Sequence, residues 1–199
     1  AALVVPSREA ERIALERWQQ PRSRVRLIPD GIETAAYLAT PKRDAVPGLV
    51  KRRGELWLGT LLTVGSEAVG PLIRSLAALP EEWQLVVAAE ERCHHAIVSN
   101  AASAGIEDRV HPVTPPADRA RLFGLFDLFA PVEATGTIEA MAAGLAVVAA
   151  RDSEAAALLA SDNGPFLSTS AEEGELTAAI ERLAGDKALR RRIGDANRA

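Results

Sequence analysis

The sequence contains few of the residues that mark disulfide-stabilised or membrane-spanning proteins. Only one of its 199 residues is a cysteine, Cys93, so no intrachain disulfide can form, and a reducing compartment fits this composition. No apolar run reaches the ~20 residues that a membrane span needs. The opening AALVVPS is apolar over five residues and lacks a basic lead, unlike a secretory signal. We therefore expect a cytoplasmic location.

An excess of basic residues is also missing. The formal net charge is −4 and the isoelectric point is near 5.5, and the Arg-rich stretches at 22–26, 51–53 and 190–192 are short. Non-specific nucleic-acid binding depends on many Lys and Arg contacts to phosphates. We therefore expect no nucleic-acid partner and interpret these stretches as solvated loops or helix faces.

Histidine is scarce, with three residues in the chain. His94 and His95 follow Cys93, but adjacent residues of a helix point in different directions. No second Cys/His cluster is present to complete a tetrahedral zinc site. The remaining His111 lies in a stretch that predicts a strand. We expect no metal site.

Several common nucleotide-binding and catalytic motifs are absent. No predicted strand is followed by G-x-G-x-x-G, and the chain has no phosphate-binding loop of the form G-x-x-x-x-G-K-[ST]. The G-x-S-x-G turn that exposes a nucleophilic serine is missing as well. These absences argue against dinucleotide binding of the usual type and against a serine hydrolase.

What the chain does contain is a regular alternation of short apolar runs and helical runs. The central apolar runs are continuous, which is typical of parallel strands covered on both faces. The predicted strands are 3–5, 24–28, 55–62, 83–89, 109–113, 128–132 and 146–150, with a weaker one at 165–168. The predicted helices are 7–18, 70–79, 92–105, 116–126 and 137–144, with further helices in 153–160 and 172–195.

This order predicts an α/β fold, a Rossmann-like doubly wound layer with one sheet of about six parallel strands. We expect Trp57 and Trp83 to be buried in it, and Ser7 to cap a first helix that also buries Trp18. Gly105 and Gly144 stand where helices commonly end, and the stretch 40–54 is a loop or hinge candidate. We treat residues 1–199 as one domain.

The stretch 131–150, PVEATGTIEAMAAGLAVVAA, holds the main candidate site. Glu133 follows a predicted strand, and Glu139 lies just inside the next helix. The backbone amides of Thr135, Gly136 and Thr137 lie between them, at a helix N-terminus suited to a diphosphate. Carboxylates on either side suit sugar hydroxyls, because an ionised acid accepts O–H hydrogen bonds. The alternative is that both glutamates only complement the helix dipole.

At these residues the chain resembles family 4 glycosyltransferases. The segments VVPSREAERIALERW and RVRLIPDGIETAAY are similar to the crossing into the second domain of these enzymes. The likeness continues through LVVAA, GIEDRVHPV, LFGLFDLFAPV and EATGTIEAMAAGLAVVAA, and ends with NGPFL and LRRRIG. The EAMAAG box is its most specific element. The resemblance implies the carboxy-terminal, nucleotide-sugar-binding half of a GT-B enzyme that retains anomeric configuration and serves glycan or glycolipid synthesis.

The resemblance also implies roles for individual residues. Glu139 would bind the ribose hydroxyls of the nucleotide, and Glu133 would be the catalytic-site acid that binds a hydroxyl of the donor sugar. Thr135, Gly136 and Thr137 would face the diphosphate. Further donor contacts are expected at Gly59 and Thr60, in the third predicted strand, and at Val110 and Pro112, whose backbone groups lie near a strand end. Such enzymes need no nicotinamide and usually no metal.

The chain departs from the family pattern at the phosphate-binding positions. Five residues separate the two glutamates where the family usually has seven. Thr60 stands where the family carries an Arg, and the region of a family Lys reads Gly65-Ser66-Glu67-Ala68, without a base. The glycine that often ends the next strand is replaced by Ala88-Ala89. These changes leave open a divergent enzyme, a non-catalytic relative or a sequence that lacks some loop residues.

The resemblance further implies that the acceptor site and part of the catalytic machinery belong to an amino-terminal domain. We therefore expect this chain alone to be unable to transfer sugar, and any peripheral membrane association to depend on that domain. Two alternatives stay open. One is a non-catalytic GT-B-like module that acts through protein–protein contact. The other is an unrelated flavodoxin-like α/β domain in which the glutamates serve only the helix dipole.

Overall fold

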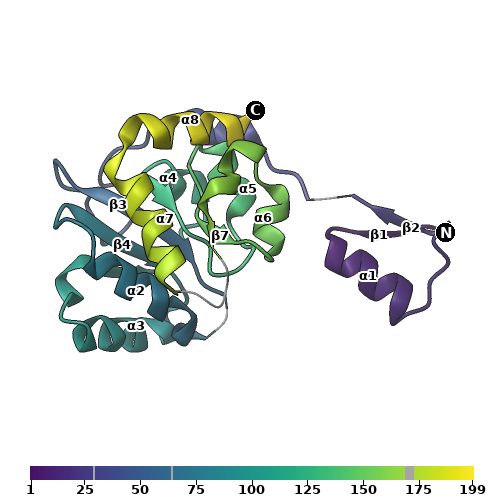
Figure 1. Ribbon diagram of the computed structural model, residues 1–199, viewed down its shortest axis with the longest axis horizontal. Helices are drawn as coiled ribbons and strands as arrows, with labels where there is room; N and C mark the ends of the chain where they lie inside the picture. The colour runs from purple at the N-terminus through teal and green to yellow at the C-terminus, as the bar shows by residue number, and fades with distance from the viewer. Residues whose placement is uncertain (29, 64, 169–172) are drawn as a thin grey trace. The chain divides into compact units, whose positions relative to one another are not determined.

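A computed structural model describes residues 1–28, 30–63, 65–168 and 173–199, which group into two compact units. Unit 1 is Ala1–Ile32 and unit 2 is Glu33–Ala199 (Figure 1). The sequence predicted one domain over residues 1–199, and this division places the first 32 residues in a unit of their own.

The strands are short and all of them pair in parallel. They are Leu3–Val5 (β1), Val25–Leu27 (β2), Leu56–Leu61 (β3), Trp83–Ala88 (β4), Val110–Val113 (β5), Leu128–Phe129 (β6), Ala149–Ala150 (β7) and Leu167–Ser168 (β8). Each lies within a predicted run, and the last three strands, β6, β7 and β8, contain only two residues each.

The helices also follow the predicted order. The α-helices are Arg8–Glu16 (α1), Gly70–Ala77 (α2), Glu91–Ser103 (α3), Arg119–Phe123 (α4), Thr137–Ala142 (α5), Glu154–Leu158 (α6), Glu173–Gly185 (α7) and Lys187–Arg198 (α8). Short 3₁₀ helices are Thr34–Leu38 (η1), Ser66–Val69 (η2), Glu107–Arg109 (η3) and Ser161–Phe166 (η4). Gly105 and Gly144 take positive φ angles of 69° and 70° just after α3 and α5, as predicted for helix ends.

Unit 1 is a small β–α–β element. β1 and β2 form a two-stranded parallel sheet of their own, and Val5, Ala14 and Val25 make its apolar cluster. Ser7 caps α1 as predicted, because its Oγ accepts a hydrogen bond from the amide three residues later at 3.1 Å. The predicted burial of Trp18 is wrong, since Trp18 is 56% exposed just beyond the end of α1.

Unit 2 contains the main sheet. β5, β4, β3 and β6 are hydrogen-bonded in that order, and β7 pairs with β8. A parallel bridge between Phe129 and Val147 joins these two groups of strands. The six strands therefore form one parallel layer in the order 5-4-3-6-7-8, and the expectation of a single sheet is corrected only by the separate β1–β2 pair in unit 1.

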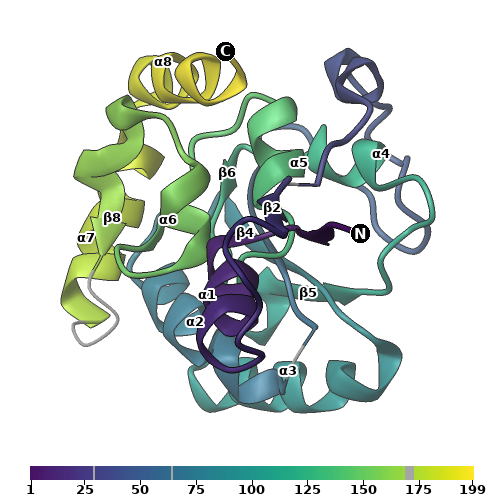
Figure 2. The ribbon, with the colours of Figure 1, turned by 90° about the vertical axis from the view of Figure 1, so that its right-hand side faces the viewer.

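Helices cover both faces of this layer (Figures 1 and 2). Residues of α2, α3 and α7 pack on one face around Leu58, Leu85 and the fully buried Trp83. Residues of α4, α5 and α6 pack on the other face around Trp57 and Val86. Successive strand residues thus alternate between two cores, which confirms the predicted α/β fold with a doubly wound parallel sheet.

The loop predicted at 40–54 contains a single antiparallel bridge, between Val46 and Leu49, and no longer element. None of the helices in the described ranges combines the length and the hydropathy that crossing a membrane requires.

Candidate functional site

The strand order of unit 2 creates a switch point between β3 and β6. From β3 the chain adds β4 and β5 on one side, and then crosses through α4 to place β6 on the other side of β3. In open parallel sheets, ligands bind beyond the carboxyl ends of strands at such a point, because the diverging connections leave a crevice there. The residues that follow β3 and β6 are therefore the first candidates for a site.

Glu133 and Thr63 connect these two strand ends. The Thr63 amide donates to Glu133 Oε1 at 3.3 Å, and the Thr63 hydroxyl donates to Glu133 Oε2. Thr63 follows β3 and Glu133 follows β6, so the hydrogen bonds span the switch point. The predicted catalytic-site acid thus lies at the expected edge, and its carboxylate is oriented by a residue that the sequence did not single out.

Gly136 shapes the turn between Glu133 and α5. Its φ angle of 86° lies in the left-handed region, which glycine adopts without a steric penalty. A Cβ at this position would lie 2.8 Å from Phe129 Cζ and 3.1 Å from Phe123 Cζ. Gly136 is therefore required both by the turn and by the aromatic side chains against which the turn packs.

The three predicted amides of this turn differ in their hydrogen bonding. The amides of Thr135 and Gly136 donate no hydrogen bond within the described part of the chain. The Thr137 amide donates to Ala134 O at 3.2 Å, so the expectation that it faces a ligand is corrected. Thr137 is fully buried, and its hydroxyl has no hydrogen-bond partner among the described residues.

Glu139 forms an ion pair across two helices. Arg119 Nη2, at the start of α4, lies 2.8 Å from Glu139 Oε1 in the first turn of α5. The Glu139 side chain is 14% exposed and the Arg119 side chain is 35% exposed. Glu139 is therefore more than a dipole partner for α5, because a cation from another element holds one of its oxygens.

Tyr37 in η1 belongs to the same cluster. Its ring packs edge-on against Phe123 with centroids 6.2 Å apart, and the guanidinium of Arg119 lies 6.0 Å from the Phe123 centroid. Burial raises the pKa of Tyr37, the charges of Glu139 and Asp118 raise it further, and the charge of Arg119 lowers it. The phenol thus stays protonated beside the ion pair.

The remaining predicted donor contacts lie within the sheet. Gly59 and Thr60 are buried in the central strand β3, where a Cβ at Gly59 would overlap the Phe126 ring. The Thr60 hydroxyl is fully buried and has no partner in the described ranges. Val110 begins β5 and is 3% exposed in the core, while Pro112 is half-buried. A contact of Val110 with a ligand is thus restricted to its backbone.

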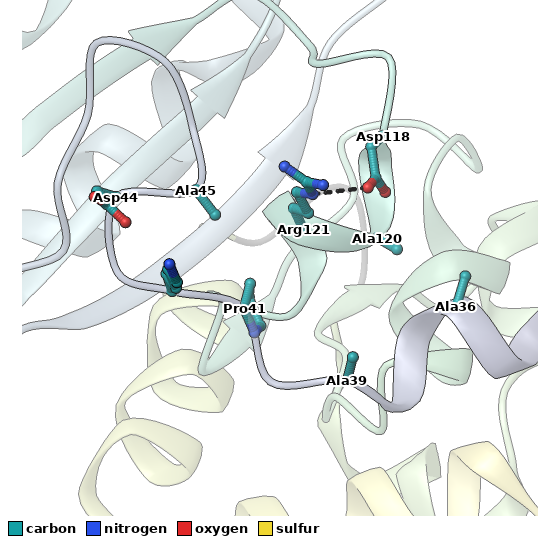
Figure 3. Close-up of a pocket in the computed structure, with 9 residues that line it drawn as sticks. Ala36, Ala39, Pro41, Asp44, Ala45, Asp118, Ala120 and Arg121 are labelled. Atoms are coloured by element: carbon teal, nitrogen blue, oxygen red, sulfur yellow. Dashed lines mark ion pairs between the residues drawn. The ribbon is translucent and has the colours of Figure 1, made fainter.

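A cavity of about 690 Å³ lies elsewhere in unit 2, between the segment 36–45 and the start of α4. Figure 3 shows small side chains, Ala36, Ala39 and Ala45, around it, with Asp118 and Arg121 paired at its rim. No predicted donor residue lines this cavity. Within the residues that the structure describes, no group of three or more His, Cys, Asp or Glu side chains is arranged to hold a metal ion.

Sequence reasoning missed Thr63, Arg119 and Tyr37. Thr63 is one hydroxyl residue after a strand, and no motif marks it. Arg119 lies in a predicted helix without a motif that marks it, and Tyr37, the single tyrosine, lies in a segment for which no helix or strand was predicted. Each gains its role from a partner on a distant element, which local patterns do not report.

Comparisons with known proteins agree with this architecture. The chain superposes on HepE of Anabaena in complex with UDP and glucose with a TM-score of 0.77 and 20% identity. It superposes on sucrose-phosphate synthase of Thermosynechococcus elongatus with a TM-score of 0.75 and 21% identity. Both matches cover 99% of this chain, which spans 57% of the HepE chain and 52% of the synthase chain.

A third likeness is to the C-terminal domain of the group 1 glycosyl transferase LpcC from Francisella tularensis. The TM-score is 0.65 at 15% identity, and the match covers 84% of this chain and 95% of that domain. At these identities the likenesses show the fold alone, which is that of the GT-B glycosyltransferases. No curated protein sequence matches the chain.

The family follows from the sequence itself. The profile of the group 1 glycosyl transferases matches residues 54–186, which is more than half of the chain and includes both Glu133 and Glu139. The chain belongs to the group 1 glycosyl transferases.

Proposed function

We propose that this chain is the carboxy-terminal, donor-binding domain of a retaining family 4 glycosyltransferase. Its substrate is a nucleotide-sugar, and the complete protein transfers the sugar to an acceptor in glycan or glycolipid synthesis. The observation that carries the proposal is the position of Glu133 in a group 1 glycosyl transferase domain. Its carboxylate accepts hydrogen bonds from Thr63 across the switch point of the sheet. A ligand crevice is expected at that point of an open parallel sheet.

The proposed roles follow from the chemistry of the residues beyond the carboxyl ends of β3 and β6. Glu133 accepts a hydrogen bond from a hydroxyl of the donor sugar, with its carboxylate held by Thr63. Glu139 accepts hydrogen bonds from the ribose diol. The amides of Thr135 and Gly136 are directed to the diphosphate, where oriented dipoles stabilise the charge that develops on the leaving group. The proposed reaction uses no resident cofactor or metal.

Two comparisons support the nature of the donor and the position of the domain. HepE, which shares the fold, is described in complex with UDP and glucose and with UDP-glucose. The LpcC structure is that of a C-terminal domain, of which the match covers 95%. These likenesses favour a nucleotide-sugar ligand and a carboxy-terminal position for unit 2.

We further propose that a preceding domain supplies the acceptor site, and that the chain alone is inactive. The chain spans 57% of the HepE chain. In unit 1, Val4, Trp18 and Ile28 are each more than half exposed beside a two-stranded sheet. Two-stranded sheets are marginal in water unless further elements pack against them. Peripheral attachment to the inner face of a membrane, if the complete protein has it, belongs to that domain.

The test is a calorimetric titration of the 199-residue chain with UDP, GDP and ADP and with their glucose conjugates. Glu139→Ala should weaken binding of the best nucleoside diphosphate by about 1–3 kcal/mol, the range for a hydrogen bond to a charged group. Thermal stability should fall by less, because a partly exposed ion pair contributes ~0–1 kcal/mol. The matched control is Glu181→Ala, an exposed glutamate of α7.

The opposite pattern would contradict the proposal. If Glu139→Ala lowers stability and leaves nucleotide affinity unchanged, the acid is structural and the edge of the sheet holds no nucleotide. Sugar transfer by the chain alone would contradict the proposed dependence on a preceding domain.

One observation favours a second candidate, a non-catalytic module that acts through protein–protein contact. Thr60 and Glu67 occupy the region where resembling enzymes carry phosphate-binding cations, and Thr60 is fully buried. A module that binds no donor needs neither cation. Nucleotide binding that depends on Glu139 would exclude this candidate, because a contact module has no use for a ribose-binding acid.

A further inference from the structure

The ion pair between Arg119 and Glu139 differs from a surface salt bridge in its surroundings. The Glu139 side chain is 14% exposed, and the Arg119 guanidinium lies over the Phe123 ring at 6.0 Å. Arg119 Nε and Nη2 are shielded from solvent and donate no directed hydrogen bond to any described residue. The 2.8 Å contact from Nη2 to Glu139 Oε1 is therefore a charge pair whose geometry falls outside hydrogen-bond limits.

The two oxygens of Glu139 are not equivalent in this arrangement. Oε1 faces Arg119, whereas Oε2 has no protein partner in the part of the chain that the structure describes. A carboxylate fixed through one oxygen keeps the lone pairs of the other for a ligand. Because a fixed side chain loses less conformational freedom when a ligand binds, such pre-organisation raises affinity.

The cluster around the pair is held by three separate elements. Arg119 comes from α4, Glu139 from α5 and Tyr37 from η1, and Phe123 packs beneath the first and the last of these. Asp118, beside Arg119, is paired with Arg121 at 2.8 Å and makes no ion pair with Arg119 in the described part of the chain. Arg119 is thus dedicated to Glu139.

We propose that Arg119 is a positioning residue for nucleotide binding: it directs the free oxygen of Glu139 at the ribose diol, and it neutralises an acid that would otherwise repel the donor diphosphate. The inference rests on the proposed function, which assigns the ribose to Glu139, and adds the residue on which that contact depends. Arg119 acts through Glu139 and itself needs no contact with the ligand.

The test measures selectivity for ribose. The probe is whichever of UDP, GDP and ADP binds the 199-residue chain most tightly, titrated beside its 2′-deoxy counterpart. The unaltered chain should prefer the ribonucleotide by about tenfold or more, as expected for a hydrogen bond to a charged group. Arg119→Met should reduce that preference to about twofold or less, because the carboxylate is no longer oriented.

Two further variants separate positioning from structure. Arg119→Lys keeps the cation and should restore part of the preference, since a lysine can pair with Oε1 but lacks the planar fork. Arg121→Met, the same change two residues later in α4, should retain the full preference, because Arg121 is paired with Asp118 and is 62% exposed. Melting curves of all variants establish that the fold is intact.

The outcomes distinguish this inference from the proposed function. Loss of the preference in Arg119→Met with recovery in Arg119→Lys supports the inference. An unchanged preference in Arg119→Met overturns it and leaves donor binding in place, as does equal binding of the ribonucleotide and the deoxyribonucleotide by the unaltered chain. If the unaltered chain binds none of the three nucleoside diphosphates, the proposed function fails and this inference fails with it.

Discussion

The contact between α8 and the end of α5 offers a sharp test of how the candidate site is supported. A Cβ at Gly194 in α8 would overlap the carbonyl oxygen of Gly144 and lie 2.7 Å from its carbonyl carbon. Around this contact, Arg198 Nε donates to Ala142 O at 3.2 Å and Asn197 Nδ2 donates to Leu145 O at 3.0 Å. Helix α8 therefore closes the carboxyl end of the helix that carries the candidate nucleotide acid.

Gly194→Ala should destabilise unit 2 despite a favourable change in helix propensity. Replacing glycine by alanine inside a helix gains about 1 kcal/mol. Overpacking against backbone that cannot rotate away costs ~1–3 kcal/mol, and displaced hydrogen bonds cost about 0.5–1.5 kcal/mol each. With two bonds displaced, the net loss is about 1–5 kcal/mol, which lowers the melting temperature by roughly 2–20 °C in a domain of this size.

The assay is urea unfolding followed through the fluorescence of Trp57 and Trp83, which are buried in unit 2. Gly185→Ala at the end of α7 is the matched control, because a Cβ there meets no atom within 4 Å. That control should be neutral or slightly stabilising. Equal stability of the Gly194 and Gly185 variants would refute the packing of α8 on α5 described above.

Three shorter predictions concern individual side chains. Burial lowers the pKa of His111 below its ordinary 6.5, so at acid pH the unfolded chain binds more protons than the folded chain. The free energy of unfolding should therefore fall as the pH drops from about 6.5 toward the folded pKa. His111→Gln should reduce this pH dependence in urea titrations. Thr60→Val should stabilise the fold by ~1 kcal/mol, because it removes a buried hydroxyl without a partner, and a loss of nucleotide affinity would instead make Thr60 a ligand contact. If a nucleotide-sugar binds more tightly than its nucleotide, Thr63→Val should reduce this difference in affinity, because valine lacks the hydroxyl that donates to Glu133. Thr63→Ser keeps the hydroxyl and should retain the difference.

The sheet of unit 2 was predictable because its strands are signalled by composition. Buried parallel strands need apolar residues on both faces, and runs such as 83–89 have them without interruption. The separation of unit 1 was not predictable, since the runs at 3–5 and 24–28 have the same composition as the others. Which strands pair depends on contacts between distant elements, and an apolar pattern records burial but not the partner.

Some residues of the candidate site could likewise be predicted from the sequence, and others could not. Glu133, Glu139 and Gly136 could be identified because they lie in one short stretch whose motif is specific. Arg119 and Thr63 could not, because each acts on a residue 20 or more positions away. The predicted role of the Thr137 amide was wrong for a local reason. This amide donates to Ala134 O within the turn before α5, so only two of the three predicted amides, those of Thr135 and Gly136, lack a partner among the described residues.

The charged residues near the switch point determine the nucleotide concentration that binding experiments need to reach. Thr60 is fully buried and Glu67 is exposed, so the segment after β3 offers a diphosphate an acid in place of cations. Each lost charge-assisted hydrogen bond costs about 1.5–3 kcal/mol, and two of them lower affinity by roughly 10²–10⁴-fold. On the proposed function, the two unbonded amides at the start of α5 would recover part of this loss. The pairing of Arg119 with Glu139 removes a repulsion but adds no direct phosphate contact, so titrations need to extend to millimolar nucleotide before an empty site is concluded.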